Sequence, residues 1–163
     1  MATKADFTTD EWKTLLESPI LSAFAISAAD PSGFFSMLRE GWANAKELAA
    51  AKTSASDELI KAVADDLFTA EGRDAARGGV TALVKGAQPT EYKDKAIAEI
   101  ARAASIVDAK APTDALAFKT WLAHMAQIVA EAGVEGGFLG FGGVQVSEKE
   151  KATLAELHKT LGV

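Results

Sequence analysis

The stretch ILSAFAISAA, residues 20–29, is apolar on almost every side of a helix, and it decides the fold that this sequence predicts. A helix that is hydrophobic all round has no face for water, so other elements must cover it on every side. Pro19 stands at its start, where the missing N–H of a proline costs nothing. We therefore expect this segment to be the buried centre of a bundle of helices.

A short helix is expected immediately before the apolar segment. Thr8 and Glu11 have the spacing of a capping box, in which each side chain accepts a hydrogen bond from the backbone N–H of the other residue. This box predicts a helix that begins near Thr9. Ser18 and Pro19 then restart the chain as a second helix, so the opening of the sequence predicts two helices with a break between them.

The rest of the chain continues the helical pattern, with apolar residues recurring every three or four positions. Gly72, Gly78 and Gly79 predict a kink or a break. The remaining helix signals are Asp30-Pro31 for a helix to about Ala51, Ser54 or Ser56 as a cap, Gly86 as a stop, Pro89 and Thr113 as starts, Ser147 with Glu150 as a second capping box, and Gly162 as a stop.

No segment shows the alternation of period two that is typical of strands. The sequence therefore predicts an all-α protein in which residues 1–163 form a single domain. The expected architecture is one compact bundle of six or seven helices, with a Gly-rich loop before the last helix.

Composition and charge narrow the classes of function. With 163 residues, 48% hydrophobic and 25% charged, the chain resembles a globular domain large enough to bury a core. The net charge of −6 is spread along the chain and leaves no basic stripe, so nucleic acid is not an expected partner. The longest uncharged stretches, such as Ser18–Ala29, fall short of the roughly 20 apolar residues of a membrane span.

The expected location is cytoplasmic. The chain contains no cysteine, which agrees with a reducing compartment and removes disulfides, thiolate nucleophiles and cysteine-ligated metals. The N-terminus carries acidic residues and lacks the apolar core of a secretory leader.

The Gly-rich stretch GVEGGFLGFGGVQVS, residues 133–147, is the most unusual feature of the chain. Its glycines match neither of the phosphate-binding patterns G-x-x-x-x-G-K-[ST] and G-x-G-x-x-G. Its large apolar side chains either tuck into the end of the bundle or form a docking patch, because aromatic anchors dominate the energetics of interfaces. Phe138, Leu139 and Phe141 are therefore the candidate residues for binding a protein partner or for self-association.

A second candidate site is a pocket for a small apolar molecule between the helices, lined by Trp42, Trp121 and His124. A carboxylate-bridged di-metal centre needs Glu-x-x-His on two helices. Trp121 stands three positions before His124, and Ala155 three positions before His158, so this motif is missing. No cofactor is predicted.

A third hypothesis is a metalloenzyme whose carboxylates come together from distant helices. It requires several members of one acidic set to point inward, although most of these side chains are expected to face water. The set consists of Asp65, Asp66, Glu71, Glu99 and Asp108.

Three stretches carry a resemblance: TTDEWKTLLESPILSAFAISAADPSG, TAEGRDAARGG and GGFLGFGGVQVSEKEKATLAEL. Together they resemble a small uncharacterised bacterial family of all-helical proteins, over most of the chain. The resemblance implies a ferritin-like bundle without the metal ligands of true ferritins, and it transfers no catalytic residue.

The leading functional hypothesis is a non-enzymatic interaction or accessory module, because no recognisable catalytic constellation occurs in the sequence. A binder of a small apolar ligand is the alternative, and the carboxylate metalloenzyme is the third hypothesis.

Overall fold

The computed structural model describes residues 2–29, 45–51, 57–132 and 146–163, and every regular element within them is helical. Residues 45–51 are helical, and two 3-10 helices, Lys4–Asp6 and Pro89–Glu91, precede longer helices. The α-helices are α1 (Thr9–Ala29), α3 (Glu58–Leu67), α4 (Ala70–Val84), α5 (Tyr92–Lys110), α6 (Ala115–Ala132) and α7 (Glu148–Leu161). The predicted all-α bundle is confirmed, and the Gly-rich loop at 133–145 lies outside the described residues.

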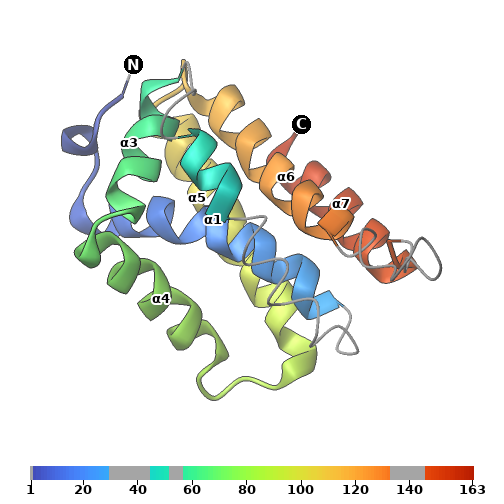
Figure 1. Cartoon of the computed structure of the whole chain (residues 1–163). Coiled ribbons are helices and arrows are strands. Elements are labelled where there is room, and N and C mark those ends of the chain that lie inside the picture. The colour runs from blue at the N-terminus through green and yellow to red at the C-terminus, as the bar shows by residue number, and fades with distance from the viewer. Residues whose placement is uncertain (1, 30–44, 52–56, 133–145) are drawn as a thin grey trace.

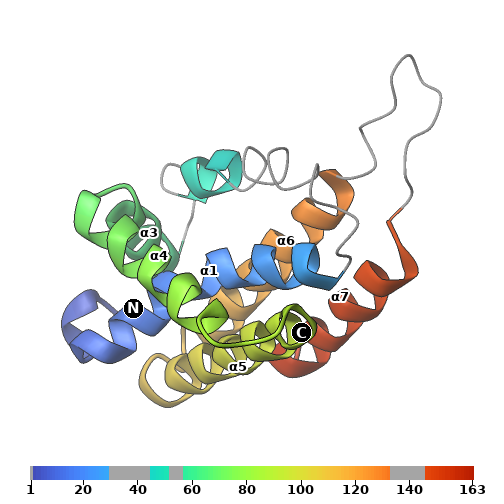
Figure 2. The same ribbon diagram turned by 90° about the horizontal axis from the view of Figure 1, so that it is seen from below.

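Helix α1 lies in the middle of the bundle, and α4 lies at its edge (Figures 1 and 2). Helix α1 packs against each of α3, α4, α5, α6 and α7. Leu15, Leu21 and Ile26 of α1 are fully buried, as are Phe118 and Leu122 of α6. Because five helices pack on α1 and none of residues 20–29 is exposed, the prediction that the apolar segment forms the centre of the bundle is confirmed.

The predicted break before Pro19 is wrong, because α1 continues through the proline as one helix of 21 residues. A proline inside a helix has no N–H for the carbonyl four residues earlier, which here belongs to Leu15. The hydroxyl of Ser18 donates a hydrogen bond to that oxygen, with Oγ 2.9 Å from it. A side chain thus supplies the donor that the proline removes, at a position that is fully buried.

We predict that Ser18→Ala lowers the free energy of unfolding by about 2 kcal/mol, because it leaves a buried carbonyl without a donor. Ser22→Ala is the matched control. Ser22 is equally buried, but its hydroxyl donates to the carbonyl of Ser18, which also accepts the backbone N–H of residue 22 in a regular helix. Urea unfolding of both variants measures the difference, and equal losses would contradict the role given to Ser18.

The predicted caps are confirmed at both ends of the chain. The backbone N–H of Thr8 lies 2.7 Å from Oε2 of Glu11, and the N–H of Glu11 lies 3.3 Å from the Thr8 hydroxyl. Ser147 and Glu150 repeat this reciprocal pair before α7. Gly162 ends α7 with φ of 71°, a left-handed conformation that glycine adopts without strain.

Two predicted boundaries need correction. Helix α3 is capped by Asp57, whose carboxylate accepts hydrogen bonds from two backbone N–H groups, and not by Ser54 or Ser56. The break in the glycine-containing run lies before its first glycine, because Thr69 caps α4 and the helix then runs through Gly72, Gly78 and Gly79. Single glycines lower helix stability by about 1 kcal/mol each and do not by themselves end a helix.

Candidate functional site

A cleft of about 490 Å³ lies between α1, α4 and α5. Each helix contributes residues spaced by three or four positions, which places them on one face of that helix. The lining consists of Asp10, Lys13, Thr14 and Glu17 from α1, Gly79, Ala82 and Leu83 from α4, and Lys95, Ala98, Glu99 and Arg102 from α5.

Glu17 is the buried acid of this cleft, with only 8% of its surface exposed. Its carboxyl group lies against the backbone of Gly79, where a Cβ would overlap its Cδ and Oε1 atoms. Its ion-pair partner is Lys13, whose Nζ is 3.7 Å from Oε1, longer than a hydrogen bond. Glu17 therefore lines the cleft without a close cation.

Burial raises the pKa of the Glu17 carboxyl group above its ordinary value, because water that would solvate the charge is excluded. The positive charges of Lys13 and Arg102 lower the pKa, and the negative charge of Glu99 adds to the increase, so burial prevails. A buried carboxyl group with a raised pKa in a cleft is a common property of functional sites.

The charges that line the cleft are loosely paired. Lys13 and Glu17 are 3.7 Å apart, and Arg102 Nη1 is 3.5 Å from Glu99 Oε2. Six other ion pairs between described residues have distances of 2.6 to 2.8 Å, and the His124–Glu47 pair is 3.6 Å long. The charged groups of the cleft are therefore freer to form ion pairs with a bound ligand than the closely paired charges elsewhere.

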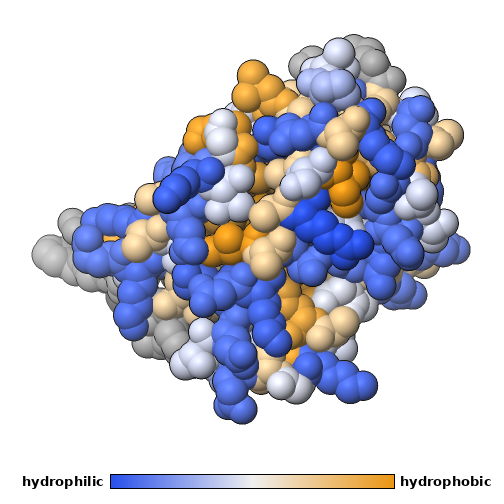
Figure 3. All heavy atoms as spheres, turned by 180° about the vertical axis from the view of Figure 1, so that it is seen from behind, coloured by the Kyte–Doolittle hydropathy of each residue, from blue (hydrophilic) through white to orange (hydrophobic). Residues whose placement is uncertain are grey.

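On the face seen in Figure 3, hydrophilic side chains cover most of the surface, with smaller hydrophobic areas between them. Among the described helices, none is long and apolar enough to cross a membrane. A membrane span is therefore not found in this part of the chain.

We predict that Glu17→Gln raises the stability of the protein at pH 7 and has little effect below pH 4.5, the ordinary pKa of the group. The raised pKa means that the native state holds this proton more tightly than the unfolded chain does. Stability is therefore lost in the parent protein as the pH rises through the native pKa, and the neutral amide avoids this loss. Urea unfolding between pH 3 and pH 7.5 measures the difference.

Glu11→Gln, in the same helix, is the control of opposite sign. A hydrogen bond from Lys110, at 2.6 Å, and the N–H of Thr8 lower the pKa of Glu11 to about 2. Its ionised form stabilises the native state above the ordinary pKa, and this contribution is lost as the pH falls from 4.5 towards 2. Glu11→Gln should therefore destabilise the protein at pH 7, and the same sign for both variants would contradict this account.

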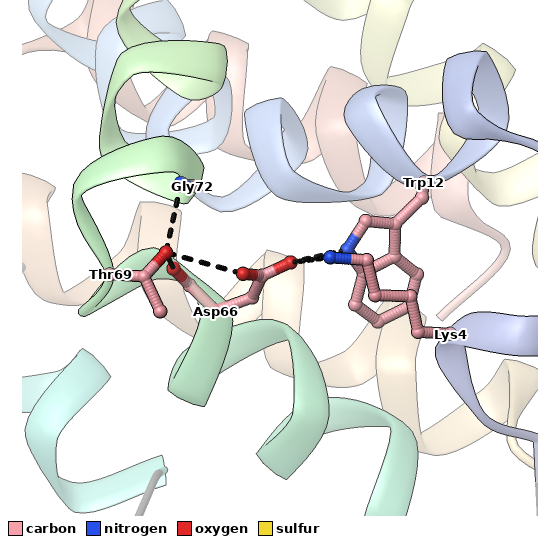
Figure 4. A network of polar contacts seen from close by, with 5 residues as sticks. All are labelled: Lys4, Trp12, Asp66, Thr69 and Gly72. Atoms are coloured by element: carbon pink, nitrogen blue, oxygen red, sulfur yellow. Dashed lines mark hydrogen bonds and ion pairs between the residues drawn. The ribbon is translucent and has the colours of Figure 1, made fainter.

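A second cleft, of about 400 Å³, lies beside the first and shares Lys13 with it. Its polar centre is Asp66, whose Oδ2 accepts a 2.7 Å hydrogen bond from the Trp12 indole and lies 2.7 Å from Lys4 Nζ (Figure 4). Burial opposes ionisation of Asp66, but hydrogen bonds from Lys4 and Trp12 outweigh it and lower the pKa. These bonds tie the N-terminal segment and α1 to the end of α3.

The carboxylates of the metalloenzyme hypothesis do not gather at one site. Glu99 lines the first cleft, Asp66 and Glu71 line the second, and Asp108 is paired with Lys119 at 2.8 Å. Within the ranges that the structure describes, no three His, Asp or Glu side chains are placed to share a metal ion. Most members of this acidic set were expected to face water, but Asp66 does not, because its partners leave only 17% of its side chain exposed.

Two residues of the predicted apolar pocket, Trp121 and His124, lie one helical turn apart on α6 but differ in burial. Trp121 is buried with its ring edge-on to Phe118, at a centroid distance of 5.6 Å. Its indole N–H has no hydrogen-bond partner among the described residues. His124 is exposed, with Nε2 3.6 Å from Glu47 Oε1. Neither lines either of the two clefts.

The other predicted site residues, Trp42, Phe138, Leu139 and Phe141, lie outside the described residues. The partner-binding surface on the Gly-rich loop and the apolar pocket around Trp42 both remain predictions.

Sequence reasoning missed Glu17 and half of its cleft. Glu99 was considered as one carboxylate of the metalloenzyme hypothesis, but the stripe on α1 was not considered at all. A signal was present, because Asp10, Thr14 and Glu17 have helical spacing. The spacing alone did not indicate a cleft, because the residues of α4 and α5 that complete it lie far from this stripe in the sequence.

Comparisons of the chain with protein-family models, with curated proteins and with solved structures found no match. The candidate site therefore stands on its own geometry.

Proposed function

We propose that this chain is a non-enzymatic binding module that takes up a small molecule with an ammonium group in the cleft between α1, α4 and α5. The observation that carries the proposal is the buried carboxylate of Glu17, which faces an open cleft while its ion-pair partner stays 3.7 Å away. Ligand sites are concave and use a few well-placed polar groups to orient the ligand.

The ionised form of Glu17 gains the most from a bound cation. Burying a carboxylate costs free energy, and the raised pKa records that cost. An ammonium group at hydrogen-bonding distance would offset it better than the more distant Lys13. Charge-assisted hydrogen bonds of this kind are about twice as strong as neutral ones. The geometry therefore favours a cation as the group that Glu17 recognises.

Charged side chains make up much of the lining of this cleft, so it supports a polar ligand better than the apolar molecule that was the alternative hypothesis. The apolar ligand was placed near Trp121, on another helix, and is a separate question from this cleft.

The test is a titration of the ¹⁵N-labelled protein with n-butylammonium chloride, followed by amide chemical shifts. We expect the shifts to change around residues 13–17, 79 and 95–102, and we expect Glu17→Gln to weaken binding by at least about tenfold, the loss of one charge-assisted bond. The pH test above checks that this variant is folded.

A matched pair of glycine variants separates the site from general stability. Gly79→Ala places a methyl group where the Glu17 carboxyl group lies and should also weaken binding. Gly78→Ala gains the same helix propensity, about 1 kcal/mol, but its methyl group has no atom within 4 Å, so binding should be unchanged. Equal binding by the parent, Glu17→Gln and Gly79→Ala would refute the proposal, and so would a parent protein that binds neither n-butylammonium nor any small amino acid.

A further inference from the structure

We infer that the ligand of this cleft is a zwitterion, a small amino-carboxylate whose ammonium group meets Glu17 and whose carboxylate meets the basic side chains of α5. The inference rests on the proposed function and names the class of ligand.

Acidic and basic residues are balanced around the cleft. The lining contains three acidic residues, Asp10, Glu17 and Glu99, and three basic ones, Lys13, Lys95 and Arg102. A simple cation attracted by Glu17 is repelled by the three basic groups, and a simple anion is repelled by the three acids. Like charges brought together cost free energy and reject the wrong ligand. A molecule with separated charges of both signs avoids both penalties.

The basic side chains of α5 that line the cleft are available to bind a carboxylate. No described residue makes an ion pair or a hydrogen bond with the side chain of Lys95. The guanidinium group of Arg102 is 3.5 Å from Glu99, and 56% of its side chain is exposed. A guanidinium group presents two parallel N–H donors that match the two oxygens of a carboxylate. Arg102 is therefore the expected partner of the ligand's carboxylate, with Lys95 beside it.

The apolar residues of the lining indicate what connects the two charged groups of the ligand. Leu83, Ala82 and Ala98 are apolar residues of α4 and α5 that face the same cleft. They suit a short chain of methylene groups between the two charges. A group with two negative charges, such as a phosphate, is less suitable than a carboxylate, because Asp10 and Glu99 repel the second charge.

The experiment measures the affinities of a series of linear amino acids in a buffer without amines or carboxylates. The probes are glycine, β-alanine, 4-aminobutyrate and 6-aminohexanoate, with n-butylammonium and butyrate as the single-charge controls. We expect one member of the series to bind at least about tenfold more tightly than either control, the equivalent of one good charge-assisted contact.

The variants assign each end of the ligand. Arg102→Gln should remove the advantage of the best amino acid over n-butylammonium, while the affinity for n-butylammonium stays the same or increases, because a repulsive charge has gone. Glu17→Gln should weaken the binding of both. Arg77→Gln, on an exposed arginine of α4 outside the lining, is the control and should change neither affinity.

The outcomes distinguish the two proposals. If n-butylammonium binds as tightly as the best amino acid, or if Arg102→Gln leaves the advantage intact, the zwitterion is refuted and the binding module stands. If neither n-butylammonium nor any amino acid binds to the parent protein, the proposed function fails and the inference fails with it. Butyrate as the tightest ligand would also overturn both, because Glu17 would then not be the anchor.

Discussion

The hydrogen bond from the Ser18 hydroxyl to the carbonyl of Leu15 is the interaction on which the arrangement of this protein depends. This bond lies where α1 passes through Pro19, so that the amphipathic first half and the apolar second half of α1 form one helix. Helical register is then kept from Asp10 to Ile26. One face of α1 carries the charges of the cleft while the others fill the core. If the helix broke at the proline, the two halves would have independent orientations, and Glu17 would have no defined place against α4.

The burial of Glu17 opposes stability, and the rest of the structure must offset it. A carboxylate with only 8% of its surface exposed loses most of its water, and Lys13 at 3.7 Å returns only part of that loss. The burial of apolar side chains around α1 stabilises the native state and offsets the free-energy cost of burying Glu17. A local loss of stability is a known trade-off at sites that bind a ligand, the role that we propose for this cleft.

Helix α4 shows how small residues bring backbones close for different purposes. A Cβ at Gly72 would overlap the backbone carbonyl of Asp66, so this glycine lets the start of α4 turn tightly against the end of α3. A Cβ at Gly79 would instead overlap the flexible end of the Glu17 side chain. Gly72 therefore allows two helices to pack closely, whereas Gly79 leaves room for the Glu17 side chain in the cleft. The two glycines lie two turns apart on the same helix.

Much of the secondary structure could be predicted from the sequence, because the interactions that decide it are local. The capping boxes at Thr8 and Ser147, the left-handed Gly162 and the apolar period of α5 each involve residues within a few positions of one another. The continuation of α1 through Pro19 was missed, although its hydrogen bond is local, because a proline more often begins a helix than lies inside one.

The candidate site was missed for a different reason. Glu17, Gly79 and Arg102 are far apart in the chain, and their proximity follows from the packing of α4 and α5 on α1. The sequence by itself therefore determined the all-helical class and most helix ends, while tertiary structure alone decided which charges share a cleft, because burial and long-range charge pairing depend on neighbours that local patterns do not identify.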